Sequence, residues 1–544
     1  MRSEWPVQEK PRRPLLASLI LQPFACALGE AALPAPRAVT GAPTFPSFLN
    51  SAFKTQNSKF LISPSVPLPF YLCCLAICGL GYLAFTARWK GWGLPMGMVL
   101  VTTTVWYVGD AIYNDYAGYR AELGDETVEA AWWQVLWFLI LFSVLAPLCH
   151  RWMNGRYLRG RSHVTLYLER QRSRRPDVQH RIDRLAAGLF LVWGLLMVIA
   201  LLQVRGDMIG LFAPYLGQKA DPWSRGQFGG GFSAFISLAA YLQIFLAAAI
   251  GVVAALTRTP RTQLIALTIV VLAMPYYIFD RTRNTMLATM MPGILAFVLM
   301  RLRLGWGGKV GALAAAFLVV NAWMLVVSST REGMKFDISK AIESLSGGGG
   351  KEEKHAGLNM FEELSWIHYL SEAGVYDPDW GARYFAELVN PIPRGLWKNK
   401  PSIGLDYALA RGQRAVGPNG ETTATISTGM IGQGVVNFGP VFGPAASALL
   451  MALWVALLAR QDLLGANPGR IVLYGTGIIL TFNIGRDITL LVLYPFFFGL
   501  ILFHGWMWWQ RSQAGKSRRL SQKHPTRKRH GPAHRRDSFY QRGL

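Results

Sequence analysis

The run RLAAGLFLVWGLLMVIALLQV at residues 184–204 contains one charged residue, Arg184, which lies at its edge. An α-helix advances about 1.5 Å per residue, so a run of this length covers a hydrocarbon layer of roughly 30 Å. A helix that is apolar on every side belongs in a protein core or in a lipid bilayer. The run therefore predicts a membrane-spanning helix.

Other runs of the same kind occur along the whole chain. They lie near residues 67–86, 94–113, 132–149, 232–256, 263–279, 285–300, 309–328, 441–459, 470–484 and 488–508. Hydrophobic residues make up 52% of the chain and charged residues only 16%, which favours the same class. We expect an all-α, polytopic integral membrane protein of about eleven or twelve transmembrane helices with one large extracytoplasmic loop.

The twelfth candidate is the apolar run at 15–29, which follows Arg12 and Arg13 and precedes Pro-rich sequence. It is similar to the short apolar region of a signal sequence. A signal-like segment, a twelfth span and a start codon assigned too far upstream are all consistent with it.

Lys and Arg are concentrated in alternate connections. The basic connections are 87–93, 151–183, 257–261, 301–309, 460–470 and the tail after 510. In contrast, the connection 114–131 carries five acidic residues and only one basic residue, Arg120. The positive-inside rule makes the basic connections cytoplasmic. The connections 114–131, 205–231, 280–284, 329–440 and 485–487 are then predicted to face outward.

This alternation predicts five parts in the chain. They are an N-terminal segment at 1–66, eight helices within 67–328, the extracytoplasmic loop at 329–440, three helices within 441–508 and a basic cytoplasmic tail at 509–544. Long irregular loops in compact proteins are usually functional. We therefore look for function in the loop.

The formal net charge of +24 is carried largely by two predicted cytoplasmic segments. Nine Arg stand against three acids in 151–183, and eleven Lys or Arg stand against Asp537 in 511–544. Anionic lipid headgroups attract such segments, so we interpret them as topology anchors and expect no nucleic-acid partner.

The five cysteines lie in or beside apolar runs, which predicts neither a disulfide framework nor a cysteine-based zinc site. Without a Walker A or dinucleotide motif, we expect no cofactor and no metal.

Several stretches of the loop have recognisable patterns. SGGGGKEEK at 346–354 predicts a flexible hinge, and MFEELSWIHYLSEA at 360–373 predicts an interfacial helix anchored by Trp366 and Tyr369. Gly429, Gly432, Gly434 and Gly439 follow within a short run. Close helix approach or a re-entrant segment explains these glycines, and backbone contact with a lipid-linked glycan is the alternative.

A family resemblance rests on three motifs. NPIPRGLWKNKP at 390–401 contains an "IPR-x-x-W-x-x-KP" core, Asn437-Phe438-Gly439 ends the downstream small-residue run, and Arg283 stands in DRTRNTML before an apolar run. Together they resemble the bacterial oligosaccharide repeat-unit polymerases, or O-antigen polymerases. The resemblance covers roughly residues 260–445, and the remainder agrees only as a pattern of spans.

The resemblance implies a glycosyltransferase of the multispanning lipid-donor type. Such an enzyme moves a growing glycan from undecaprenyl pyrophosphate onto a new lipid-linked repeat unit at the outer face of the bacterial cytoplasmic membrane. Its partners would be that lipid-linked oligosaccharide, membrane lipids, and a flippase and chain-length regulator of the same pathway. The leaving pyrophosphate requires positive charge at the membrane surface, which Arg supplies as a bidentate donor.

The candidate substrate-binding residues are cations, with one aromatic residue, on predicted outward segments. They are Arg281, Arg283, Arg394, Lys400, Arg411, Arg414, Arg486 and Trp397. Several of them have a structural alternative. Arg281 and Arg283 suit interfacial anchors with Asp280, Arg394 suits a salt bridge, Arg486 suits an ion pair with Asp487, and Trp397 suits an aromatic belt.

A base that accepts the proton of the acceptor hydroxyl would assist the transfer. The loop offers Glu362, Glu363, His368, Glu387, Asp406 and Glu421. We place His368 first for its pKa, together with Glu421, which precedes the Thr/Ser-rich approach to the membrane, as catalytic candidates.

Other functions stay open. Asp125-Glu126 suits a lipid-phosphate-sugar glycosyltransferase with an acidic pair in its first outer loop, and an O-antigen ligase-like enzyme would share the cationic loop. A polysaccharide transporter or flippase usually buries ionisable residues within its spans or shows paired broken helices, and neither pattern is evident here.

Overall fold

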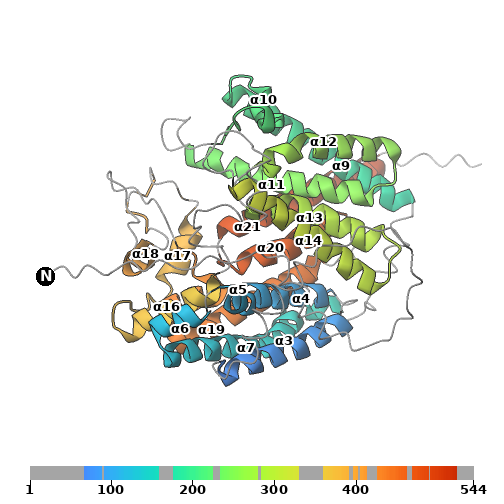
Figure 1. The fold of residues 1–544 in the computed structure, drawn as a ribbon. Helices are drawn as coiled ribbons and strands as arrows, with labels where there is room; N and C mark the ends of the chain where they lie inside the picture. The colour runs from blue at the N-terminus through green and yellow to red at the C-terminus, as the bar shows by residue number, and fades with distance from the viewer. Residues whose placement is uncertain are drawn as a thin grey trace, which may run out of the picture. The chain divides into compact units, whose positions relative to one another are not determined.

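All regular secondary structure is helical in the part of the chain that the structure, a computed structural model, describes (Figure 1). That part comprises residues 66–87, 91–114, 116–158, 176–223, 233–279, 283–329, 359–390, 392, 396–397, 399–401, 405–412, 426–461, 468–488 and 490–523. The run at 15–29 and the hinge at 346–354 lie outside it. The chain divides after Phe498 into two compact units.

Each of the eleven predicted spans coincides with helix. The helices are α3 (Leu68–Thr86), α4 (Gly93–Thr103) continued by η2 (Thr104–Val108) and α5 (Gly109–Tyr113), α7 (Asp125–Leu158), α9 (Pro176–Gln203), α11 (Ser233–Leu256), α12 (Pro260–Ile278), α13 (Arg283–Met300), α14 (Trp306–Ser329), α19 (Gly429–Gln461), α20 (Pro468–Ile484) and α21 (Leu490–Lys523). Six of them, α3, α7, α9, α11, α12 and α19, are long and apolar enough to cross a membrane. The chain is an all-α, multi-pass membrane protein.

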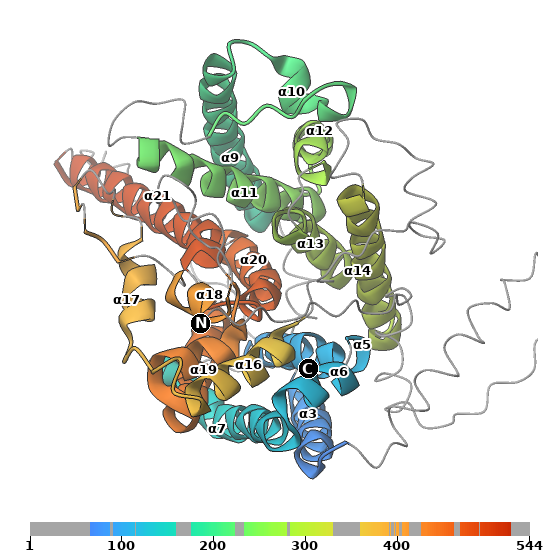
Figure 2. The same cartoon turned by 60° about the vertical axis from the view of Figure 1, so that its left-hand side comes forward.

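Short helices occupy the connections. They are α6 (Tyr116–Leu123), α10 (Met208–Phe212), η3 (Pro214–Leu216), α16 (Met360–Glu372), α17 (Ala382–Val389) and α18 (Leu405–Ala410). The helix predicted at 360–373 is therefore present as α16. It packs between α7 and α19 (Figure 2), and Phe361 stacks on Trp132 with 3.9 Å between ring centroids. The apolar face of α16 is thus buried against the bundle.

The five connections predicted to face outward are joined at one end of the bundle. Tyr215 lies against Phe279 at the end of α12, 5.7 Å between ring centroids. Asn483 Nδ2 donates to the carbonyl of Asn284 at 3.2 Å. Thr127 donates to Glu372, and the N–H of Gly429 donates to the carbonyl of Arg486 at 2.8 Å.

Three of the basic connections, 151–183, 257–261 and 301–309, meet at the opposite end. Asp183 accepts hydrogen bonds from Thr257 and Thr259, and Arg301 donates to the carbonyl groups of Ala255 and Thr257. The arginine thereby satisfies carbonyl groups that the C-terminus of α11 leaves unpaired. The alternation of charge along the sequence thus corresponds to two spatially separate groups of connections.

Cysteine labelling would show which side of the membrane each of these two ends faces. Glu126 and Arg261 are exposed at opposite ends. We expect Glu126→Cys to react with a membrane-impermeant maleimide in intact cells, and Arg261→Cys to react only after permeabilisation. The unsubstituted chain gives the background from its native cysteines. The reverse pattern would place the long loop in the cytoplasm.

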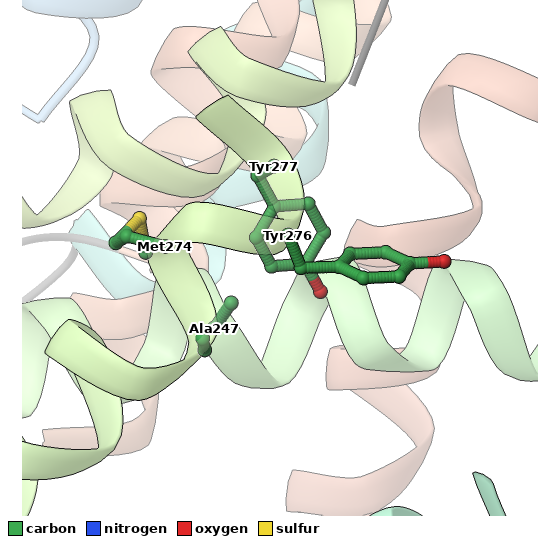
Figure 3. Packing of buried hydrophobic residues seen from close by; sticks show 5 residues of the cluster. Ala247, Met274, Tyr276 and Tyr277 are labelled. Atoms are coloured by element: carbon green, nitrogen blue, oxygen red, sulfur yellow. The ribbon is translucent and has the colours of Figure 1, made fainter. Parts of the chain in front are cut away.

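The packing of α11 illustrates how the spans come together. Gly251 of α11 lies directly against the backbone of Gly293 of α13, where small residues allow close helix approach. On α11's neighbour α12, Met274, Tyr276 and Tyr277 pack around Ala247 (Figure 3). These contacts bury aromatic surface between α11 and α12.

Helix α19 is a hairpin rather than a straight span. Gly439 has φ 76° and ψ 178°, a conformation that glycine adopts readily, and it separates a first arm, 429–438, from a second arm, 440–461. The arms run side by side: Ser447 Oγ donates to the carbonyl of Met430 at 2.7 Å. The predicted span at 441–459 is the second arm, and the glycine-rich run before it forms the first. Close helix approach, one of the explanations considered for those glycines, holds for Gly434, which lies against the backbone of Gly443.

The hairpin requires glycine where its arms touch. A Cβ on Gly434 would collide with the carbonyl of Gly443, and a Cβ on Gly443 would collide with the backbone of Val435. We expect Gly434→Ala and Gly443→Ala each to lower the free energy of unfolding by about 1–3 kcal/mol or more, the usual cost of overpacking. Thermal denaturation in detergent, followed by size-exclusion chromatography, measures this. Gly194→Ala in α9, where nothing lies within 4 Å, is the control and should leave the melting temperature unchanged or raise it.

Two helix N-termini at this end are satisfied by residues far away in sequence. Asp110 Oδ2 accepts from the N–H groups of Phe361 and Glu362 at 2.6 and 2.8 Å, so α5 supplies the cap of α16. The hydroxyl of Tyr107 accepts from the N–H of Ile431 at 2.8 Å. The first N–H groups of a helix have no partner within the helix, and both helices obtain theirs from the segment 93–113.

Candidate functional site

Helix α17 presents a charged face to the protein interior. Arg383 and Glu387 are four residues apart, so they lie on the same side of the helix. Both are buried, with 5% and 4% of their surface exposed. Charged residues are rarely buried to this extent unless they are paired or used.

Two further carboxyl groups belong to the same cluster. Asp379 precedes α17, and Asp487 lies in the turn between α20 and α21; both interact electrostatically with Arg383. Asp487 is held by Thr428, whose N–H and hydroxyl donate to its Oδ1 at 3.1 and 3.2 Å. The long loop and the last outward turn therefore build one site. We call Asp379, Arg383, Glu387 and Asp487 the Arg383 cluster.

Helix α17 is fixed in place by the first arm of α19. The N–H of Asp379 donates to the carbonyl of Val436, and the N–H of Tyr384 donates to Asn437 Oδ1, both at 3.1 Å. Gln433 Oε1 in turn accepts from the N–H of Ile488, one residue past Asp487. The first arm thus connects the two segments that contribute the charged side chains.

Several buried polar atoms of this region have no hydrogen-bond partner among the described residues. They are Arg383 Nε and Nη1, Glu387 Oε2, Asp379 Oδ1 and Gln433 Nε2. Buried polar atoms in folded proteins almost always have partners. Two nitrogens of the Arg383 guanidinium and one carboxylate oxygen of Glu387 thus have hydrogen-bonding capacity that the described residues do not use.

The carboxyl groups of the Arg383 cluster are held towards their protonated forms. The pKa of Glu387 is raised to about 7, mainly by burial and to a smaller extent by the nearby Asp487, while Arg383 opposes the shift. Burial also raises the pKa of Asp379 and of Asp487 above the ordinary value for a carboxyl group. Glu387 is thus poised to exchange a proton near neutral pH, as a general base requires.

His368, the leading base candidate from the sequence, lies in a different environment. Its Nδ1 is 3.2 Å from Gln134 Nε2 of α7, and its Nε2 is 3.2 Å from Glu372. Burial lowers its pKa, and Glu372 partly offsets that shift. None of these contacts involves the Arg383 cluster, so the structure does not bring His368 together with it.

Arg411 is engaged by a second group of residues. It lies 3.4 Å from Glu363 Oε2 and 4.0 Å from Glu362 Oε1, and its guanidinium carbon is 3.8 Å from the ring centroid of Trp366. Tyr407 also donates to Glu363, at 2.7 Å. Arg411 therefore ties α18 to α16.

The remaining described candidates also have defined contacts. Lys400 donates to the carbonyl groups of Asn390 and Ile392 at 2.8 and 3.0 Å, which braces the motif segment 390–401. Trp397 packs against Phe385 of α17, 6.3 Å between ring centroids. Arg486 donates to Ser427 at 2.8 Å, and it also interacts electrostatically with Asp487, the partner expected for it.

Other predicted residues cannot be placed in the site. Arg281, Arg394, Arg414 and Glu421 lie outside the described residues. Arg283 begins α13, although its side chain lies outside the described part. Of the alternative acidic pair, Asp125 is bonded to Arg120 at 2.5 and 2.8 Å. The described residues include no group of three or more His, Cys, Asp or Glu side chains placed to hold a metal ion.

Sequence reasoning missed Arg383 and gave Glu387 no preference over five other candidates. In ARYFAELV, residues 382–389, Arg383 and Glu387 share a helix face that excludes Phe385 and Leu388, but this pattern is typical of a charged face in water and gave no signal of burial. Comparison with known proteins identifies no matching protein family, no similar characterised protein and no similar solved structure.

Proposed function

We propose that this chain is a glycosyltransferase that polymerises lipid-linked oligosaccharide repeat units into a surface polysaccharide. The donor would be a glycan on undecaprenyl pyrophosphate, and the reaction would occur at the outer face of the bacterial inner membrane. The observation that carries the proposal is the Arg383 cluster, a buried guanidinium beside a carboxyl group with a pKa of about 7. It lies on the segments predicted to face outward.

The chemistry of the cluster fits the transfer in two respects. A pyrophosphate leaving group gains negative charge as the glycosidic bond breaks, and a buried guanidinium stabilises that charge strongly. The acceptor hydroxyl must lose a proton as it attacks, and Glu387 in its deprotonated form would accept it. Arg383 and Glu387 thus supply the two functions on one helix.

The sequence motifs support the same proposal. The segment 390–401 follows α17 directly, and Lys400 and Trp397 hold its described part close to that helix. Arg394, at the centre of the motif, would provide a further guanidinium for the same pyrophosphate. Arg283 and Arg486, on outward-predicted segments, would add positive charge, and a flippase and a chain-length regulator would be the partner proteins.

Reconstitution with lipid-linked repeat units tests the proposal. Purified protein in liposomes is given undecaprenyl-pyrophosphate-linked repeat units, and the products are separated by size. A ladder of multiples of the repeat unit supports a polymerase. Transfer only to an added lipid A core would indicate the ligase-like alternative. Movement of the repeat unit across the bilayer without a new glycosidic bond would indicate a flippase or transporter.

A further inference from the structure

Helix α17 has an inverted distribution of polar and apolar residues. Its charged residues, Arg383 and Glu387, face inward, while Phe385 and Leu388 have 50% and 64% of their surface exposed. A surface helix in water shows the opposite arrangement. The apolar face of α17 therefore requires an apolar environment outside the protein.

Hydrogen bonds fix the level of α17 along the bundle. The N–H of Tyr384 donates to Asn437 Oδ1, at the top of the first arm of α19. Beyond the turn at Gly439, the carbonyl of Val441 accepts from Trp137 Nε1 of α7 at 3.2 Å. The N-terminus of α17, the tip of the hairpin and Trp137 therefore lie at about the same level.

Trp137 lies within the apolar part of α7. The last acidic residue at the outer end of α7 is Glu129, and eight residues of helix, about 12 Å at ~1.5 Å per residue, separate it from Trp137. The predicted span begins near residue 132, which places Trp137 five residues inside it. Val441 and Phe442 at the hairpin tip are also exposed, by 63% and 64%, as expected for residues in contact with lipid.

We infer that α17 lies in the outer leaflet of the membrane, with Phe385 and Leu388 against lipid acyl chains. Helix α17 would then separate the Arg383 cluster, on its inner face, from the lipid. The occupant of the exposed face is lipid, because the face is apolar and stands level with a membrane-embedded part of α7. The inference is independent of the reaction that the cluster performs.

Depth-dependent fluorescence quenching tests the inference. An environment-sensitive fluorescent amino acid is incorporated by stop-codon suppression at position 385 or 388, and the full chain is placed in lipid nanodiscs. One quencher is iodide in the buffer, and the other is a nitroxide attached to a lipid acyl chain close to the headgroup. We expect the nitroxide to quench both positions several-fold more strongly than iodide does.

Two positions on α7 calibrate the measurement. Ile140, 46% exposed in the apolar part of the helix, gives the response of a residue in lipid, and the exposed Glu126 gives the response of a residue in water. Quenching by iodide at 385 and 388, as at Glu126, would overturn the inference. Protection from both quenchers would overturn it too, because it would show that protein, from this chain or a partner, covers the face.

Discussion

Replacing Arg383 by lysine is expected to abolish most polymer formation although it keeps the charge. One ammonium group cannot reproduce the planar set of donors of a guanidinium on a phosphate. Losing such a contact in the transition state typically costs about 2–4 kcal/mol, which corresponds to a roughly 30- to 1000-fold lower rate. The measurement is the initial rate of chain extension in liposomes, at matched protein amounts.

The burial of Arg383 makes the choice of variant important. Replacement by a neutral residue would leave Asp379, Glu387 and Asp487 without their nearby cation and would endanger folding. Arg383→Lys avoids this, and an unchanged elution profile shows that the fold is kept. Arg120→Lys, on an exposed pair with Asp125, is the matched control and should keep full activity. Normal polymer from Arg383→Lys would make Arg383 structural and move the assignment to Arg283 and Arg394.

Replacing Glu387 by glutamine is expected to lower the rate by about 10²- to 10⁴-fold, the usual contribution of a general base. The amide has nearly the same shape but cannot accept the proton of the acceptor hydroxyl. The reaction of the unsubstituted protein should accelerate as the pH rises through about 7, because the deprotonated form of Glu387 is the base. The groups acting on it are Asp487 from the turn, Arg383 from its own helix and Tyr494 of α21.

The pH profile separates this role from a purely structural one. In Glu387→Gln the residual rate should no longer rise near pH 7, whereas a variant that only loosened the fold would keep the rise at a lower level. His368→Gln provides the comparison, since His368 contacts Gln134 and Glu372 instead. If His368→Gln removes the pH dependence and Glu387→Gln does not, the base is the histidine.

Much of the fold followed from the sequence because a membrane imposes long apolar runs that few other structures require. The grouping of the outward-predicted connections at one end, and of three basic connections at the other, also followed from Lys and Arg. The first arm of α19 was harder to predict, since its glycines serve a contact with Gly443 that only folding creates. No local pattern in 429–438 distinguishes a helix that turns back from a loop leading into a span.

The site was less predictable than the fold for a related reason. Arg383 and Glu387, four residues apart, form the same pattern as an ordinary exposed helix pair. Their burial depends on Asp487 and on the first arm, which lie far along the chain. The pKa of Glu387 is set by those neighbours and by burial, so spacing alone gave it no advantage over His368 or Glu421.

The caps that Asp110 and Tyr107 provide have a consequence for biogenesis. The segment 93–113 leaves the ribosome early, whereas its partners Phe361, Glu362 and Ile431 are synthesised much later. Trp106 Nε1 likewise donates to the carbonyl of Phe482, which is also synthesised late. Until then these polar groups lack their native partners in a segment that must enter a bilayer, where unpaired polar groups are costly. The segment 93–113 is therefore among the last to be completed although it is made early, and a ribosome that stalls before residue 359 leaves a nascent chain in which this segment still lacks its partners.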